Sequence, residues 1–110
     1  MCTADDSDRV VVPIGQSVTL NCSTSQPIEW FYQRSENSLA KQICSAGAMV
    51  NGFEADNKYF FSKTNPADKG LVIKNFTVEE TGIYSCRDTK HGVLRILHLK
   101  VSGTIIICLY

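Results

Sequence analysis

One stretch decides the fold of this chain: Glu79-Glu80-Thr81-Gly82-Ile83-Tyr84-Ser85-Cys86. Its second half reads as a β-strand that carries a cysteine, and its first half as a tight acidic turn in which Gly82 relieves the backbone. Tyr84 stands two positions before Cys86, so both side chains lie on one face of the strand. A buried tyrosine needs a partner for its hydroxyl, and we expect the preceding turn to offer a backbone group.

Two residues nearer the N-terminus, Cys22 and Trp30, complete a longer pattern. Cys22 ends an alternating run with Val18 and Leu20, and Trp30 follows in the next apolar segment. Cysteine, then tryptophan, then Tyr-x-Cys is the order found in immunoglobulin domains. The chain therefore resembles a V-set domain of the immunoglobulin superfamily over roughly Arg9–Ser102.

This resemblance implies an all-β fold, an immunoglobulin-like V-type β-sandwich with Greek-key connections and two antiparallel sheets. It implies a structural disulfide between Cys22 and Cys86, and a salt bridge between Lys58 and Glu80 beside the acidic turn. The long interval between the two cysteines leaves room for the extra C′ and C″ strands, which favours the variable over the constant type. The core signature that the resemblance implies is Trp30, Leu71 and Tyr84.

The composition limits the class of protein. A chain of 110 residues with 44% hydrophobic and 20% charged residues suits one domain with one core. The net charge is zero and basic residues do not cluster, so nucleic acid is not expected as a partner. Five cysteines indicate an oxidising compartment, hence an extracellular or cell-surface location, secreted or single-pass. Without a Cys-x-x-Cys pair, and with His91 and His98 lacking ligand spacing, we expect no metal and no cofactor.

The domain boundaries follow from composition. Residues 1–8 are polar and acidic and are expected to form a flexible tail. Residues 9–102 form the V-set domain. Residues 103–110 are apolar but too few to cross a bilayer, which needs about 20 residues. They read either as the start of a membrane-proximal or transmembrane segment or as an overlong last strand.

Within the domain, alternation and turn residues predict a series of strands. Pro13 marks the first strand as an edge strand. The segment 45–57 is rich in Gly, Ala and Asn and is expected to hold the C″ strand and a loop, in which Met49, Val50 and Phe53 form either an apolar contact surface or packing against the sheet edge. The predicted strands are Arg9–Pro13, Ser17–Cys22, Trp30–Arg34, Lys41–Cys44, Lys58–Lys63, Leu71–Lys74, Ile83–Asp88 and Val93–Val101.

Alternation also predicts an outward face on four of these strands, the usual meeting surface in this family. In the family's lettering they are C (Trp30–Arg34), C′ (Lys41–Cys44), F (Ile83–Asp88) and G (Val93–Val101). An outward phenylalanine among polar residues resembles an interface, although an isolated exposed phenylalanine is also common. The loops at the ends of the strands are too short to form a binding site of their own. The candidate interface residues are Phe31, Gln33, Gln42, Cys44, Ser85, Arg87, His98 and Lys100.

Two features bear on self-association. Gln33 occupies the position at which paired variable domains exchange a symmetric glutamine hydrogen bond, so the resemblance implies a homodimer about a two-fold axis. The Phe-Gly-x-Gly bulge of antigen-receptor G strands is missing, since the region reads His91-Gly92-Val93-Leu94-Arg95-Ile96. Antigen-receptor pairing geometry is therefore not expected.

Three cysteines remain beyond the implied disulfide. Because Cys2, Cys44 and Cys108 are an odd number, at least one is free or bonds another chain. Either Cys44, predicted outward on C′, or Cys108 could link a dimer; the alternative is a buried thiol. The sequons Asn21-Cys22-Ser23 and Asn75-Phe76-Thr77 make Asn21 and Asn75 candidate glycosylation sites.

The sequence favours a binding protein over an enzyme. Neither histidine lies beside a nucleophile motif, and the adjacent carboxylates Glu79 and Glu80 point to different sides, so no catalytic residue is assigned. The leading hypothesis is a recognition module of an immune-type or adhesion receptor, which binds a protein ligand or itself through the G-F-C-C′ face. The alternatives are a structural spacer domain of a larger surface protein and a small-ligand or carbohydrate receptor that uses the segment 45–57.

Overall fold

The computed structural model describes residues 9–22, 27–45, 48–53, 57–61 and 70–102. These residues form strands joined by turns, and the turn before the eighth strand contains the short 3-10 helix η2 (Val78–Glu80). The strands are β1 (Arg9–Pro13), β2 (Val18–Leu20), β3 (Ile28–Gln33), β4 (Lys41–Ser45), β5 (Ala48–Met49), β6 (Tyr59–Phe61), β7 (Leu71–Ile73), β8 (Gly82–Asp88) and β9 (Gly92–Ser102).

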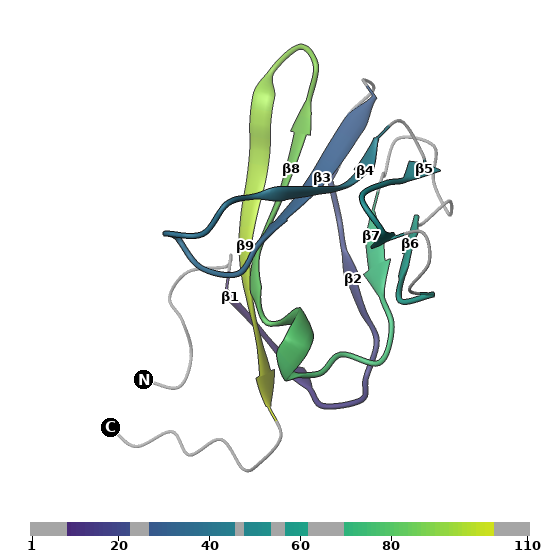
Figure 1. Ribbon diagram of the computed structural model, residues 1–110, viewed down its shortest axis with the longest axis vertical. Helices are drawn as coiled ribbons and strands as arrows, with labels where there is room; N and C mark the ends of the chain where they lie inside the picture. The colour runs from purple at the N-terminus through teal and green to yellow at the C-terminus, as the bar shows by residue number, and fades with distance from the viewer. Residues whose placement is uncertain (1–8, 23–26, 46–47, 54–56, 62–69, 103–110) are drawn as a thin grey trace.

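The strands make two sheets that face each other (Figure 1). The larger has the order β1-β9-β8-β3-β4-β5 and is called here the six-stranded sheet; the smaller has the order β2-β7-β6 and is called the three-stranded sheet. Neighbouring strands are antiparallel except β1, which runs parallel to β9. The all-β, V-type sandwich expected from the sequence is therefore confirmed.

The first strand lies at an edge, as Pro13 predicted, because proline has no N–H to donate to a second neighbour. Beyond it, Gly15 adopts a positive φ of 84°, a conformation that glycine accepts without strain. Its N–H donates to the carbonyl of Phe76 at 2.8 Å. This turn carries the chain from the six-stranded sheet into β2 of the three-stranded sheet.

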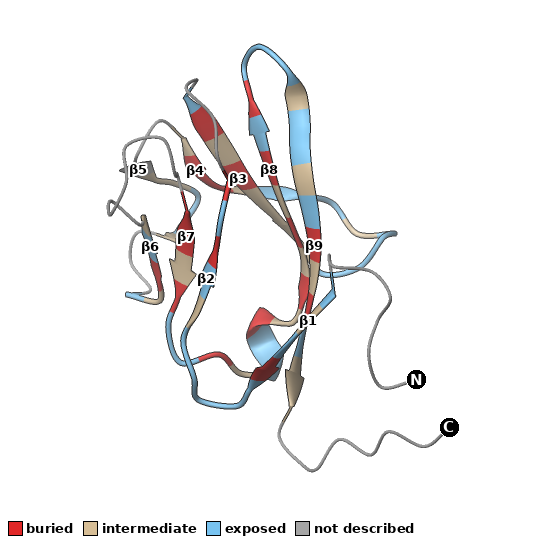
Figure 2. Cartoon of the chain, turned by 180° about the vertical axis from the view of Figure 1, so that it is seen from behind, coloured by how far each residue is buried: buried red, intermediate tan, exposed pale blue. Residues whose placement is uncertain are grey.

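Buried residues, red in Figure 2, alternate with more exposed ones along most of the strands and form the core between the sheets. Trp30, Leu71 and Tyr84 are completely buried, in agreement with the expected core. The neighbours that share this core are Val12, Leu20, Cys22, Ile28, Ile43, Cys44, Tyr59, Ile73, Phe76, Cys86, Leu97 and Leu99. The burial of these apolar side chains is the main favourable contribution to folding.

One prediction for β4, the C′ strand, is wrong. Strict alternation placed Ile43 inward and Cys44 outward, but both side chains are fully buried. Trp30 pairs with Cys44 while Phe31 pairs with Gln42, so Ile43 is an extra residue in β4, a β-bulge. The bulge shifts the alternation by one position, and Cys44 faces the core with Trp30.

The segment 45–57 contributes β5, the expected short C″ strand, paired with β4. Met49 and Phe53 pack against the core, and the Phe53 ring meets the Tyr59 ring edge-on at 4.9 Å. The sequence left open whether Met49 and Phe53 form an apolar contact surface or pack against the sheet. In the structure they pack against the sheet. The predicted tails at 1–8 and 103–110, with Cys2 and Cys108, lie outside the described residues.

Candidate functional site: the outer face of the six-stranded sheet

The turn before β8 fixes the position of that strand. Thr77 caps η2, its hydroxyl accepting a hydrogen bond from the Glu79 N–H at 3.2 Å. The Glu80 carboxylate accepts from the Thr77 N–H at 2.8 Å and forms an ion pair of 2.7 Å with Lys58. Burial by itself raises the pKa of Glu80, but the hydrogen bonds from Lys58 and Thr77 outweigh burial and lower it below the ordinary value. A carboxylate charge is thus held in place at the start of β8.

Tyr84 ties β8 to the same turn. Its hydroxyl donates to the Glu80 carbonyl at 2.6 Å, so the backbone partner expected from the sequence is present. Burial raises the pKa of Tyr84, which keeps the hydroxyl protonated as a donor. Beside it, a Cβ on Gly82 would lie 2.6 Å from the carbonyl oxygen of Gln33, which only glycine avoids.

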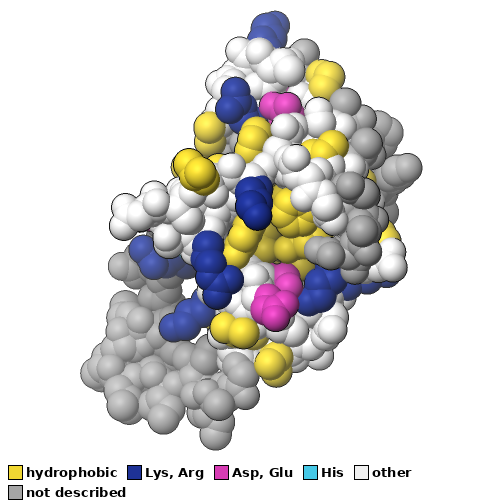
Figure 3. All heavy atoms as spheres, viewed as in Figure 1, with side chains coloured by type: hydrophobic (Ala, Val, Ile, Leu, Met, Phe, Trp, Pro, Cys, Tyr) yellow, Lys and Arg dark blue, Asp and Glu magenta, His cyan; other side chains and the backbone are white. Residues whose placement is uncertain are grey.

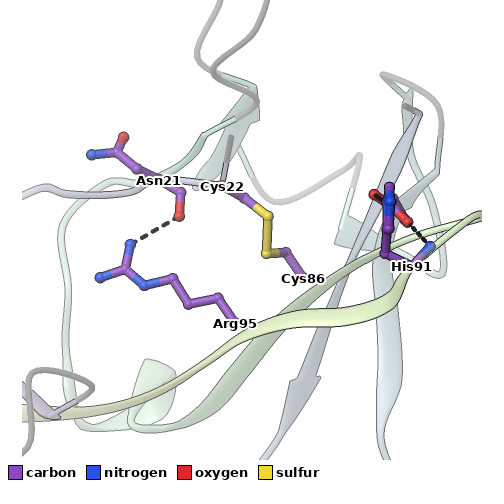
Figure 4. The surroundings of a disulfide bond; sticks show 6 residues. Asn21, Cys22, Cys86, His91 and Arg95 are labelled. Atoms are coloured by element: carbon purple, nitrogen blue, oxygen red, sulfur yellow. Dashed lines mark hydrogen bonds and ion pairs between the residues drawn. A yellow bond between two sulfur atoms is a disulfide. The ribbon is translucent and has the colours of Figure 1, made fainter. Parts of the chain in front are cut away.

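A disulfide joins the two layers through the core. Cys22 and Cys86 are bonded, with their Cα atoms 6.6 Å apart, as the resemblance implied. Figure 4 shows Arg95 reaching from β9 past this bond, and its guanidinium donates to the backbone carbonyl of Asn21 at 2.9 Å. Arg95 is the register partner of Cys86, so it lies on the inner side of β9. The bond and this arginine fix the six-stranded sheet against the three-stranded sheet.

With these inner residues fixed, the alternate residues form an outer face on β4, β3, β8 and β9, called here the outer sheet face. Register pairing arranges it in rows. The middle row is Gln42, Phe31, Ser85 and Ile96. The row on one side is Glu29, Arg87 and Val93, and the row on the other is Gln33, Ile83 and His98.

The structure therefore brings together seven of the eight candidate interface residues. Phe31, Gln33, Gln42, Ser85 and His98 are partly exposed, and Arg87 and Lys100 are exposed. Lys100 lies on β9 two positions beyond His98 and pairs with Val11 of β1. Cys44 does not belong to the face, since it is a buried free thiol whose pKa burial raises to about 11. It cannot link two copies of the folded domain.

Side-chain contacts join the rows of the outer sheet face. Glu29 lies 3.8 Å from the Arg87 guanidinium and accepts a hydrogen bond of 2.9 Å from the Gln42 amide. The Arg87 guanidinium also stands over the Phe31 ring at 5.5 Å. Glu29 was not among the sequence candidates, although its position next to inward Trp30 places it on the outward side by alternation.

Three hydrophobic side chains on β9 were also missed. Val93, Leu94 and Ile96 are 57%, 39% and 45% exposed. Ile96 alternates with inward Leu97 and could have been assigned from the sequence; Val93 and Leu94 sit at a register shift opposite Cys86 and Arg87, which alternation does not reveal. On the side of the molecule drawn in Figure 3, hydrophobic side chains lie among basic and acidic ones.

The Gln33 amide is engaged within its own chain. Its nitrogen donates to the carbonyls of Glu36 at 3.1 Å and Ser38 at 3.0 Å, across the turn between β3 and β4. A symmetric glutamine pair needs this nitrogen as a donor to the second copy. In the conformation that the structure shows, that donor supports the turn instead.

The turn between β8 and β9 is short and closed. The buried Asp88 carboxylate accepts from the N–H groups of Lys90 and His91, and lies 2.9 Å from His91 Nδ1. A turn this short does not project beyond the strands to contact a ligand. At this end of the sheet, the exposed surface is therefore formed by strands β8 and β9. Asn21 and Asn75, the glycosylation candidates, are both exposed and lie off this face, beside β2 and β7.

No group of three or more His, Cys, Asp and Glu side chains that could hold a metal ion occurs in the described parts of the chain. The same residues contain no helix long and apolar enough to span a bilayer. What the structure offers is a sheet surface with aromatic, aliphatic and charged groups, a mixture typical of protein contacts.

Comparison with known proteins agrees with this architecture. The family model of the immunoglobulin V-set domain matches residues 5–102. A search of curated proteins finds no matching sequence. Two similar solved structures are the ZIG-8 IG1 homodimer and the ZIG-8–RIG-5 IG1–IG1 heterodimer, each with 19% identity and a TM-score of 0.68. The first match covers 91% of this chain and 83% of the other, and the second 90% and 85%. V-set domains are a non-enzymatic class of domain. Because the family model matches residues 5–102, which is most of the chain, this chain belongs to the immunoglobulin V-set family.

Proposed function

We propose that this domain is an extracellular protein-recognition module of a cell-surface receptor or adhesion protein, and that it binds protein partners through the outer sheet face. The first partner we propose is a second copy of the chain, related by a two-fold axis. An isologous contact of this kind places the same patch on both copies. The Cys22–Cys86 disulfide supports the extracellular location, since such bonds persist in oxidising compartments.

The observation that carries the proposal is the middle row of the outer sheet face. Phe31 and Ile96 lie on either side of the small Ser85, with Gln42 at the end of the row. Aromatic side chains at the centre of a patch, bordered by polar residues, are typical of the residues that dominate binding energy. Glu29, Arg87 and His98 supply that polar border in the adjacent rows.

The rigidity of the paired strands favours the same assignment. The rows belong to paired strands that a disulfide holds against the second sheet, so little ordering entropy is lost when a partner binds. The turn between β8 and β9 is held by Asp88 and does not extend beyond the strands as a binding loop. Two of the solved structures with a similar fold are a homodimer and a heterodimer of IG1 domains, which supports an association between immunoglobulin domains here.

Sedimentation velocity of the purified domain tests self-association directly. We expect concentration-dependent dimers, and Phe31→Ala should weaken dimerisation by about 2 kcal/mol, roughly thirty-fold in Kd, if Phe31 is a central contact.

Phe60→Ala is a matched control for this experiment. Phe60 is also a partly exposed ring under a cation, with the Lys74 ammonium 4.4 Å from its centre, but it lies on the three-stranded sheet. Its loss should leave the dimer unchanged. A domain that stays monomeric at all concentrations, or equal weakening by both variants, would contradict the proposed face.

A further inference from the structure

The two sequons lie on the opposite side of the molecule from the outer sheet face. Asn21 directly follows β2, and Asn75 lies two positions after β7, so both belong to the three-stranded sheet. β2 and β7 are antiparallel, with Val18 opposite Ile73 and Leu20 opposite Leu71. The two asparagines therefore lie at opposite ends of this sheet.

The Asn21 side chain points away from the core. Leu20 and Cys22, its neighbours in sequence, are both buried, whereas Asn21 is exposed. Its backbone carbonyl accepts the hydrogen bond from Arg95, which leaves the side-chain amide outside that contact (Figure 4). A bulky group on the amide nitrogen would extend into solvent without displacing a core residue.

Asn75 is exposed in a turn with a positive φ of 51°, a conformation that asparagine tolerates better than most residues. The Lys58 ammonium binds its backbone carbonyl at 3.0 Å, which holds the main chain and not the side chain. The sequon residue Thr77 is engaged with Glu80 in the folded domain. Glycosylation at Asn75 therefore fits a chain that is modified before this turn folds, while the Thr77 hydroxyl is still accessible.

Between the two asparagines lies a surface that needs cover. Thr19, Val72 and Phe60 are register partners on the outer side of the three-stranded sheet. Phe60 is 37% exposed, and β6 is an edge strand of three residues. An exposed hydrophobic side chain on the outside of a sheet invites unwanted association unless something blocks it.

We propose that N-linked oligosaccharides on Asn21 and Asn75 cover the outer side of the three-stranded sheet and leave the outer sheet face as the surface open to protein partners. In this reaction the asparagine amide nitrogen bonds to the anomeric carbon of an oligosaccharide carried on a lipid diphosphate. The bond from that carbon to the diphosphate breaks, and the amide proton leaves with the lipid diphosphate. The glycan sites follow from the sequons and the exposure of both residues; the directing role also rests on the proposed function.

Mass spectrometry of the domain secreted from glycosylating cells tests the sites. Asn21 and Asn75 peptides should carry glycan, and Asn21→Asp and Asn75→Asp should each remove one glycan from the intact mass. Asn57→Asp is the control, since Asn57 is exposed with a φ of 55° but has no sequon, and it should change no glycan mass. Bare asparagine at either sequon overturns the proposal, because part of the sheet then stays open.

A new sequon on the outer sheet face provides separate tests of two claims: that glycans cover the three-stranded sheet, and that the outer sheet face binds the partner. Arg87→Asn creates one with Asp88 and Thr89, on the outer sheet face. Enzymatic removal of the native glycans should leave dimerisation unchanged, whereas a glycan at position 87 should abolish it. Removal should also permit a second association, through the uncovered three-stranded sheet, and species larger than the dimer should form. A protein that forms no such species after glycan removal overturns the directing role. Dimerisation that persists with a glycan at position 87 overturns the proposed recognition face and leaves the glycan sites standing.

Discussion

The two sides of the six-stranded sheet are built from alternate residues of the same strands, yet they are held in different ways. On the inner side of β8, Tyr84 and Cys86 are fully buried, one bonded to the turn and the other to the second sheet. On the outer side, Ser85 is partly exposed, and Arg87 meets its neighbours through a long ion pair and a ring contact that solvent reaches. Inner residues therefore set the stability of the domain, and outer residues can change at little cost in stability.

Removing the disulfide tests the inner side most strongly. Cys22→Ala combined with Cys86→Ala should lower the free energy of unfolding by about 4 kcal/mol, because the bond closes a loop with a sequence separation of 64. Urea denaturation measures this change. Ser85→Ala, one position away on the outer side, is the control and should change it by less than about 0.5 kcal/mol. Similar losses in both variants would show that the two sides do not differ.

A methyl group at Gly82 tests the close approach of β8 to β3. Gly82→Ala places a carbon 2.6 Å from the Gln33 carbonyl and should cost roughly 2–3 kcal/mol of unfolding free energy through overpacking. Gly92→Ala is the control at the start of β9, opposite Asp88 at the other end of β8, with a positive φ of 79° and nothing near its Cβ. It should cost about 1 kcal/mol from backbone strain alone. A smaller loss for Gly82→Ala than for Gly92→Ala in thermal unfolding would contradict the packing argument.

The contribution of Glu80 to the free energy of unfolding depends on pH. Its folded-state pKa is lowered, so its ionised form stabilises the fold above the ordinary glutamate pKa, and this contribution is lost as the pH falls through the folded-state pKa. Glu80→Gln should cost roughly 1.5 kcal/mol at neutral pH, since it removes charged hydrogen bonds to Lys58 and Thr77. Unfolding measured from neutral to acid pH should show the variant and the parent converging. Glu79→Gln, on the exposed side of the same turn, is the control; a constant gap between parent and Glu80→Gln at every pH would refute the linkage.

Cys44 gives the smallest expected signal, which is none. A buried thiol with a pKa of about 11 should not react with a water-soluble maleimide while the domain is folded. Labelling at this position should appear only as urea unfolds the domain. Rapid labelling of Cys44 in the native domain would return it to the outer sheet face and undo the bulge assignment.

Sequence alone predicted the inner side well, because period-two alternation anchored on Trp30, Tyr84 and Leu97 determines which residues are buried. It failed at Cys44, since one extra residue in β4 shifts every later side chain and leaves no mark in a short apolar run. The engagement of the Gln33 amide with its own turn depends on loop geometry that residue spacing does not encode. The outer sheet face could be located by alternation, but the contacts that join Glu29, Arg87 and Phe31 could not.

The parallel pairing of β1 with β9 has a mechanical consequence. Arg9 lies beside His98 and Pro13 beside Ser102, so residue 9, at the start of β1, and residue 102, at the end of β9, lie at opposite ends of the pair. A pulling force applied between residue 9 and residue 102 would slide one strand along the other, and the bonds between them would have to break together. Tension along the chain would thus load this domain by shear between its first and last strands.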